Sequence, residues 1–288
     1  MAEISASDVK KLREQTGAGM MECKKALVDT DGDFAKAEKL LKEKGLAAVE
    51  KRSDRATNQG KIFIKTAGTG EEGSAIALVE LVSETDFVAR NPDFISLGGA
   101  MAGKVLEKGY TEPNEELNGM VSDLAAKIRE NMGLRRVNLV KAGPGEYITS
   151  YIHGEGAIGV VVKLASDNAE ALKKDEVKEL AHNLALHVSW ANPSALDRDK
   201  VDPAYIKENE DIFRKQMETD ESLKGKPEKV LEGILSGKVG KFLKSICLMD
   251  QPFVKDEKFT VSQVLLDAGK AAGARFSIAG YVYFKVGA

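Results

Sequence analysis

The sequence predicts an α+β protein with a compact three-helix region, two strand-containing regions of similar order, and an antiparallel helical hairpin inserted in a sheet domain. Two observations carry this prediction. Apolar residues recur at helical spacing at the start of the chain and over residues 204–248, whereas strand-like apolar runs occupy residues 61–82, 147–164 and 276–286. With 43% hydrophobic and 30% charged residues among 288, the chain is sufficient for more than one domain.

The N-terminal part of the chain predicts three short helices. A capping signature at residues 5–8 opens the first helix, which ends at the glycine-rich break of residues 16–19. Apolar residues at helical spacing continue over residues 20–27 and, after an Asp-Gly-Asp turn, over residues 34–41. The following KRSDRATNQGK, residues 51–61, contains no large apolar residue and predicts a mobile linker.

The next region predicts a hairpin followed by helices. The strand-like runs at residues 61–66 and 75–82 are separated by a glycine-rich turn, so we expect them to pair antiparallel. Asn91 as a cap and Pro92 in the first turn then begin a helix, and another helix is expected over residues 115–132. The buried face of the first of these helices is predicted to contain Phe94, Leu97, Met101, Val105 and Leu106.

A similar order of elements returns over residues 147–188. The run AIALVEL at 75–81 resembles AIGVVVKL at 157–164, which suggests an internal duplication, although apolar runs this short also match by chance. Residues 204–248 then predict two antiparallel helices around the polar connection ETDESLKGKP. Because strand-like residues of one parity resume at 276–286, we expect this helical hairpin to be inserted in a sheet domain and to project from the body.

Composition excludes several classes of function. A formal net charge of -3 gives the chain no general attraction to phosphate backbones or anionic lipid, so no direct nucleic-acid partner is expected. No apolar run approaches the roughly 20 residues of a membrane span, and no secretory signal opens the chain, so we expect no membrane association and a cytoplasmic location. Cys23 and Cys247 lie at otherwise apolar positions and are expected to be reduced and buried rather than disulfide-bonded.

The run GEGAIG at residues 154–159 matches the GxGxxG pattern of dinucleotide sites. That chemistry needs the glycines between a strand and a helix, where backbone amides meet a pyrophosphate. Here β-branched, strand-like residues follow the glycines, which favours a hairpin turn. The chain also has no GxxxxGK[ST] loop, so no nucleotide or other cofactor is expected in this protein.

The histidines give no sign of catalysis or of metal binding. His153, His182 and His187 form no HExxH spacing, and neither cysteine lies near another ligand pair, so we expect no metal site and no enzyme. His182 and His187 are interpreted as surface or half-buried helix residues. His153, beside the glycine turn, has two open interpretations, a structural histidine or an exposed contact with a partner.

Phe87 follows a strand that ends near Val82 and precedes the Asn91-Pro92 break. Because Ser83, Thr85 and Asp86 are all competent helix caps, FVAR is predicted to form a short helical turn at the surface. Spacing alone favours a Phe87 that packs under the adjacent helix with Phe94. The alternative is an exposed working side chain at a strand end.

Three stretches carry a resemblance to a known family. They are LREQTGAGMMECKKAL at 12–27, ETDFVARN at 84–91, and SYIHGEGAIGVVV at 150–162 with the later KFLKSICLMDQPFV at 241–254. The sequence closely resembles bacterial elongation factor Ts, a family of guanine-nucleotide exchange factors for elongation factor Tu. Many members continue past the last strand into a helical module that also touches the partner, whereas this sequence stops at Ala288, so we expect binding to depend on the core and the N-terminal domain.

The resemblance implies a domain plan. It is a ubiquitin-associated-like domain over residues 1–50, a linker over 51–60, a first core subdomain over 61–146, a second core subdomain over 147–200 and 250–288, and a coiled-coil hairpin inserted over 201–249. Each core subdomain is expected to hold a small antiparallel sheet with helices packed on it.

The resemblance also implies where the protein binds. The family's Thr-Asp-Phe-Val motif falls on Thr85, Asp86, Phe87 and Val88, where it disturbs the magnesium site of elongation factor Tu. The TGAGMM turn, with Gly17, Gly19, Met20 and Met21, is implied to be a further contact edge. His153, from its place beside the glycine turn, is a further candidate contact with the partner. The partner would be met both with GDP bound and free of nucleotide. A coiled-coil scaffold and a dinucleotide-binding enzyme are the alternatives.

Overall fold

The structure, a computed structural model, describes residues 4–288 as a mixture of helices and small antiparallel sheets. Its helices are α1 (Ala6–Thr16), α2 (Met20–Asp29), α3 (Phe34–Glu50), α4 (Asp86–Ala89), α5 (Pro92–Lys108), α6 (Glu115–Ile128), α7 (Asp175–Ala191), α8 (Pro203–Glu218), α9 (Glu228–Ile246) and α10 (Val261–Ala272). Its strands are β1 (Gln59–Ala67), β2 (Ala75–Ser83), β3 (Met132–Lys141), β4 (Glu146–His153), β5 (Ile158–Ser166), β6 (Pro252–Phe253), β7 (Asp256–Thr260) and β8 (Phe276–Lys285). The predicted α+β class is confirmed.

Two three-stranded antiparallel sheets form the body of the molecule. The first has the order β1-β2-β3 and the second β4-β5-β8, so the similar runs at 75–81 and 157–164 lie in the two central strands. Both central strands carry a register shift next to a charged residue, Glu80 in β2 and Lys163 in β5. The sequence prediction missed β3 and extended a helix to residue 132, because the two arginines and the asparagine of MGLRRVNLVK interrupt its apolar alternation.

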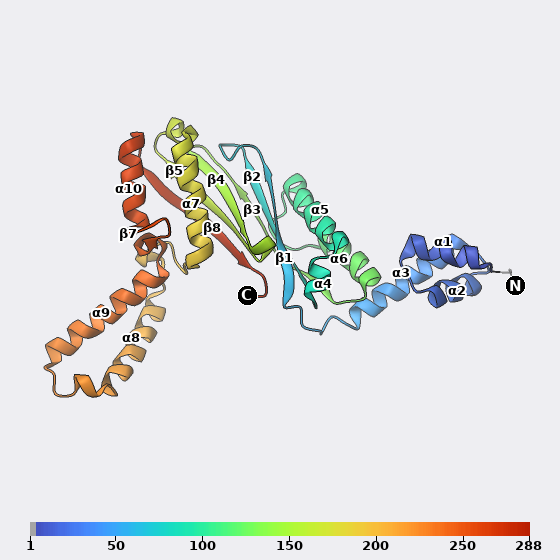
Figure 1. The fold of residues 1–288 in the computed structure, drawn as a ribbon, viewed down its shortest axis with the longest axis horizontal. Helices are drawn as coiled ribbons and strands as arrows, with labels where there is room; N and C mark the ends of the chain where they lie inside the picture. The colour runs from blue at the N-terminus through green and yellow to red at the C-terminus, as the bar shows by residue number, and fades with distance from the viewer. Residues whose placement is uncertain (1–3) are drawn as a thin grey trace.

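The two sheets pack against each other, and each carries helices on its outer face (Figure 1). Along β2, Ala77, Val79 and Leu81 pack with α5 and α6, whereas Ile76 and Leu78 pack with residues of the second sheet. This alternation is the two-residue period of a strand buried on both faces. The body is therefore a four-layer arrangement with one apolar core between the sheets and one under each helical layer.

The glycines of residues 154–159 have structural roles at this junction. Gly154 and Gly156 have positive φ angles of 57° and 103° in the turn that joins β4 to β5, which pair antiparallel as predicted. A Cβ atom on Gly159 would lie 2.5 Å from Ile62 Cγ2 of the first sheet, so this glycine permits the close approach of the sheets. The strand that follows the turn is incompatible with the dinucleotide motif, which requires a helix there.

An ion pair between β2 and β3 of the first sheet also contacts the second sheet. The fully buried carboxylate of Glu80 accepts a hydrogen bond from Arg136 Nε of β3 at 2.5 Å. The Arg136 guanidinium lies 4.4 Å from the ring centre of Phe284 and donates to the carbonyl oxygen of Lys285 at 2.8 Å. Glu80 and Arg136 therefore connect the centre of the first sheet to the last strand of the second.

Helices α1–α3 form a separate small core, which includes the fully buried Leu12, Cys23 and Leu27. The end of α3 packs against α6, where a Cβ on Gly45 would lie 3.0 Å from Ala126 Cβ. The segment expected to be a mobile linker is held by Asn131, whose side-chain amide donates to the carbonyl oxygens of Ser53 and Arg55. Strand β1 begins at Gln59, inside the range given to that linker.

Helices α8 and α9 form an antiparallel hairpin that extends away from the body, as predicted (Figure 1); we call residues 201–249 the arm. The base of the arm packs on its own cluster, which includes Ala195, Leu243 and the free, buried Cys247. Cys23 is also free and buried, as predicted. In the described part of the chain, no helix is long and apolar enough to cross a membrane.

His187 of α7 is fully buried against residues 251–254, which follow the arm, so its prediction as a surface or half-buried residue was wrong. Its Nε2 lies 3.1 Å from Gln251 Oε1, and its Nδ1 accepts a hydrogen bond from the backbone of Val254. The sequence carried the signal, because His187 falls on the apolar face of α7 defined by Leu180 and Leu184. His182 is exposed, in agreement with its prediction.

We expect the stability of the fold to decrease when the pH falls below about 6.5, the pKa of an unperturbed histidine. Burial lowers the pKa of His187 in the folded protein, so the unfolded chain binds a proton first and is favoured in acid. Calorimetry between pH 7.5 and 5.5 checks this expectation. The fall in the melting temperature should be smaller for His187→Gln than for wild type, whereas the exposed-site variant His182→Gln should follow wild type. Parallel slopes for all three proteins would contradict the role of His187.

Candidate functional site

Helix α4 is a single turn between β2 and α5, and its first residues are held by side-chain caps. Thr85 is the N-cap, and its Oγ1 accepts a hydrogen bond from the backbone of Val88 at 3.4 Å. The same hydroxyl donates to the carboxylate of Glu130, with distances of 2.9 and 3.1 Å to its oxygens. The buried Ser83 hydroxyl donates to the Thr85 carbonyl oxygen at 2.9 Å. We call residues 84–90 the Phe87 turn.

Phe87 and Val88 lie on different faces of this turn. Val88 and Ala89 are buried in the core under α5, whereas the side chain of Phe87 is 81% exposed. The expectation from spacing alone, that Phe87 packs with Phe94, was wrong. One helical turn has room for one buried face, which Val88 and Ala89 fill, and Phe94 instead packs against Phe63 of β1 with ring centres 6.0 Å apart.

Asp86 and Glu84 give the Phe87 turn its charges. The Asp86 carboxylate is half exposed and lies 3.4 Å from Arg90 one turn later. Glu84 accepts a hydrogen bond from the backbone N–H of Asn131 at 2.5 Å and lies 3.3 Å from the Arg55 guanidinium. The backbone on both sides of Phe87 is therefore fixed by hydrogen bonds, while Phe87 itself contacts solvent.

A second exposed apolar surface lies at the start of α2; we call residues 17–21 the methionine edge. Gly17 ends α1 in the left-handed conformation with φ 68°, a position that favours glycine. Gly19 caps α2, and its N–H donates to the side chain of Glu22 at 3.0 Å. Met20 and Met21 begin the helix and are 45% and 75% exposed. Methionine side chains are flexible and polarizable, so they can fit irregular partner surfaces.

The structure links the Phe87 turn to the methionine edge through the end of α6. Arg129 forms an ion pair with Glu22 beside the methionine edge, and the adjacent Glu130 accepts the Thr85 hydroxyl. His153, at the end of β4, is exposed and lies 3.3 Å from the Tyr151 hydroxyl. Among the described residues, no hydrogen bond or ion pair joins His153 to either surface. Sequence reasoning missed Glu130 because the helix predicted to residue 132 placed it inside a helix.

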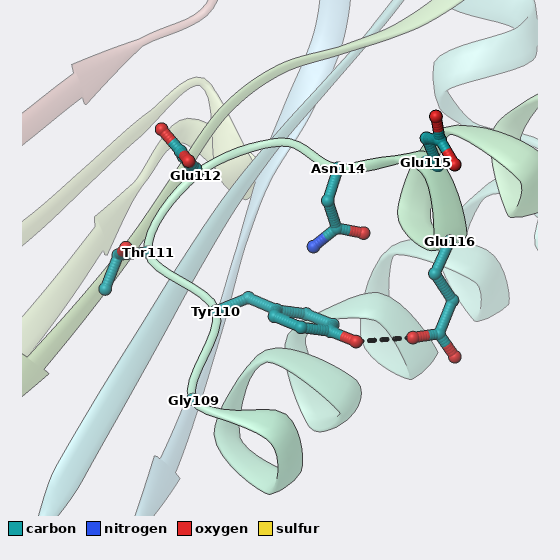
Figure 2. Close-up of a pocket in the computed structure, with 7 residues that line it drawn as sticks. All are labelled: Gly109, Tyr110, Thr111, Glu112, Asn114, Glu115 and Glu116. Atoms are coloured by element: carbon teal, nitrogen blue, oxygen red, sulfur yellow. Dashed lines mark hydrogen bonds between the residues drawn. The ribbon is translucent and has the colours of Figure 1, made fainter.

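A shallow depression beside the loop between α5 and α6 is lined by Tyr110 and by carboxylates (Figure 2). Its Glu116 already accepts hydrogen bonds from Lys104 and Tyr110, each at 2.5 Å, and the bond from Lys104 holds the pKa of this carboxyl below its usual value. Over residues 4–288, no group of three or more histidine, cysteine, aspartate or glutamate side chains is arranged to hold a metal ion.

Comparison with known proteins identifies the family. Residues 84–288 match the sequence model of a family described as Elongation factor TS. The chain belongs to the elongation factor Ts family. Elongation factor Ts of Treponema denticola is 47% identical over 285 residues, which cover 99% of this chain and 99% of that relative. The proteins of the same name from Treponema pallidum and Borreliella burgdorferi are 42% and 39% identical over 291 and 289 residues, covering 99% and 100% of both chains.

Membership of the elongation factor Ts family makes the protein a translation elongation factor. The family match begins at Glu84, the first residue of the Phe87 turn, and runs through both sheets and the arm. The relatives extend the similarity over the three N-terminal helices, including the methionine edge. Both exposed surfaces therefore lie within the shared sequence.

Proposed function

We propose that this protein speeds the release of GDP from elongation factor Tu, and that Phe87 does so by entering the partner near its magnesium ion and phosphate ligands. The observation that carries the proposal is the 81% exposure of an aromatic side chain on a turn whose backbone is held on both sides. An exposed phenylalanine on a rigid turn is unfavourable in the free protein and becomes favourable when a partner covers it.

The chemistry of the partner explains why an apolar side chain suffices. GTPases hold GDP through backbone amides, a lysine and Mg²⁺ around the phosphates, so displacement of any of these elements weakens the binding of nucleotide and metal together. Burial of a phenylalanine contributes about 1.5–3 kcal/mol, which corresponds to roughly ten- to hundredfold in affinity. The half-exposed Asp86 adds a negative charge that opposes nearby phosphate groups. No covalent step is needed, so the protein acts as an exchange factor rather than as an enzyme.

The methionine edge and His153 would contribute binding energy to the complex, whereas Phe87 would displace the magnesium and phosphate ligands of the partner. In this proposal, Thr85 and Val88 hold the turn, while Gly17, Gly19, Met20, Met21 and His153 add contacts with the same partner. A coiled-coil scaffold would explain the arm but gives no role to the exposed Phe87. A dinucleotide-binding enzyme is disfavoured because a strand, not a helix, follows the glycines of residues 154–159.

Thermodynamic linkage supplies the test of this proposal. If the protein weakens GDP binding to elongation factor Tu by some factor, GDP must weaken the binding of the protein by the same factor. Titration calorimetry should therefore give a tighter complex with nucleotide-free elongation factor Tu than with the same protein in saturating GDP and Mg²⁺. Coupling of this kind is typically about 5- to 150-fold. Equal affinities in the two states would overturn the proposal.

A further inference from the structure

Three consecutive residues after α6 each bind a different part of the molecule. Arg129 pairs with Glu22 at the start of α2, Glu130 accepts the Thr85 hydroxyl of the Phe87 turn, and Asn131 donates to the segment that joins α3 to β1. These contacts connect segments that lie far apart in the sequence. We call residues 129–131 the α6 clasp.

Arg129 occupies a backbone position that favours a different residue. It ends α6 with φ 68°, in the left-handed region, where the Cβ atom of a non-glycine residue is crowded. Helices α1, α5 and α10 place glycine at the same position. Arginine adopts the left-handed conformation less readily than glycine does. The side chain of Arg129, however, makes a contact that glycine could not make.

That contact reaches the methionine edge directly. Glu22 accepts both the N–H of Gly19, which caps α2, and the Arg129 guanidinium. A Cβ on Gly19 would lie 3.4 Å from Arg129 Nη2, so the arginine lies against the first residue of the cap. Met20 and Met21 follow immediately, and their direction is set by the same capped turn. Because the pair is half exposed, it contributes little to overall stability.

Glu130 acts in the same way on the other surface. Its carboxylate fixes the hydroxyl of Thr85, and that hydroxyl caps the turn that presents Phe87. Asn131 is buried, and its backbone N–H and C=O both bond to Glu84, the first residue of the same turn. The α6 clasp therefore connects the two exposed apolar surfaces through adjacent residues of one backbone.

We propose that Arg129 and Glu130 are positioning residues that hold the methionine edge and the Phe87 turn in one fixed relation, so that both meet the same partner at once. This inference rests on the proposed exchange function. When two contact surfaces are held in a fixed geometry, binding of the first places the second at a high effective concentration near its own site on the partner. Greater freedom of movement between the two surfaces lowers that effective concentration and weakens binding. Arg129 acts on the attachment of the methionine edge, whereas Glu130 acts on the presentation of Phe87.

The test measures GDP release from elongation factor Tu loaded with fluorescent GDP, at increasing concentrations of the full chain. Arg129→Gly should raise the concentration for half-maximal release about fivefold, since binding loses fixed geometry. It should leave the maximal rate within about twofold of wild type, and its melting temperature should be equal or higher because glycine suits the left-handed position. Glu22→Gln, which keeps a capping side chain, should shift the half-maximal concentration in the same direction.

Glu130→Ala should instead lower the maximal rate, about threefold or more, because the capping hydroxyl of Thr85 loses its acceptor. Glu130→Gln retains an acceptor oxygen and should restore most of that rate. If Arg129 and Glu130 had a purely structural role, their variants would have lower melting temperatures. Arg129→Gly would then not act selectively on the half-maximal concentration, nor Glu130→Ala on the maximal rate.

The possible failures are distinguishable. If wild type does not accelerate GDP release, both the exchange function and the present inference are overturned. If wild type is active while Arg129→Gly and Glu22→Gln keep its half-maximal concentration, or Glu130→Ala keeps its maximal rate, only the positioning role is overturned. Similar rises in half-maximal concentration for Arg129→Gly and Glu22→Gln, with melting temperatures no lower than that of wild type, support the positioning role.

Discussion

Replacement of Phe87 by alanine is expected to slow the stimulated release of GDP from elongation factor Tu by roughly ten- to hundredfold, since the burial energy of about 1.5–3 kcal/mol is lost from the complex. The isolated protein should be as stable as wild type, because the side chain is 81% exposed and the turn is held by Thr85, Ser83 and Glu84. Stopped-flow fluorescence of a labelled nucleotide measures the release rate, and calorimetry measures the stability.

A matched control separates this effect from a general loss of apolar surface. Phe259, in β7, is an exposed phenylalanine, at 45%, that lies outside both proposed contact surfaces. Phe259→Ala should leave the maximal release rate close to that of wild type. Phe87→Leu should retain part of the activity, because leucine still buries apolar area. A release rate unaffected by Phe87→Ala would remove this side chain from the mechanism.

Loss of the Arg136 charge is expected to produce the largest change in stability among surface-accessible positions of the sheets. In Arg136→Met the apolar stem is kept, but the carboxylate of Glu80 is left fully buried without its cation. Removal of one partner of a buried ion pair reduces the free energy of unfolding by about 3–5 kcal/mol. The lower part of that range applies here, since the Arg136 side chain is itself partly exposed. Urea unfolding followed by circular dichroism measures the change.

Two controls test the physical cause. The double variant Glu80→Leu/Arg136→Met removes both charges and should be more stable than Arg136→Met alone, because no ion remains buried without a partner. Lys163→Met removes the equivalent charge at the register shift of the second sheet and should have a smaller effect, since its partner Glu146 is partly exposed and can be hydrated. A double variant no more stable than Arg136→Met would contradict the explanation.

Sequence patterns predicted the elements with strong local signals. The α5 cap at Asn91, the helical hairpin of the arm and the strand-like runs of β1, β2, β4, β5 and β8 were all expected from spacing and capping. The prediction missed β3, where charged residues break the alternation, although one of them, Arg136, forms the ion pair with Glu80 of the neighbouring β2. It also missed α10, even though Thr260 and Gly273 bracket that helix with a cap at each end.

The candidate site was predictable in composition but not in geometry. The caps around Phe87 indicated a surface turn, yet local spacing favoured its burial, because sequence alone cannot show that Val88 and Ala89 already fill the buried face. The contacts of Glu130 and Asn131 join residues more than forty positions apart, so no local pattern reveals them. The sheet-on-sheet packing is likewise a long-range outcome: the sequence pattern placed Gly159 in a hairpin turn, whereas in the structure this glycine permits the close approach of the two sheets.

The arm has a consequence for how the chain folds. Strands β5 and β8 are neighbours, although α7, the arm and α10 lie between them in the sequence. At the root of the arm, Ser194 and Ala195 donate backbone hydrogen bonds to Ile246, and Leu248 donates one to Ala195. Helical hairpins form rapidly from local contacts, and chain closure becomes easier as the loop shortens. Once the hairpin has formed, its root joins the two ends of a segment of about fifty residues. The effective loop that must close when β8 pairs with β5 is then shorter by that length.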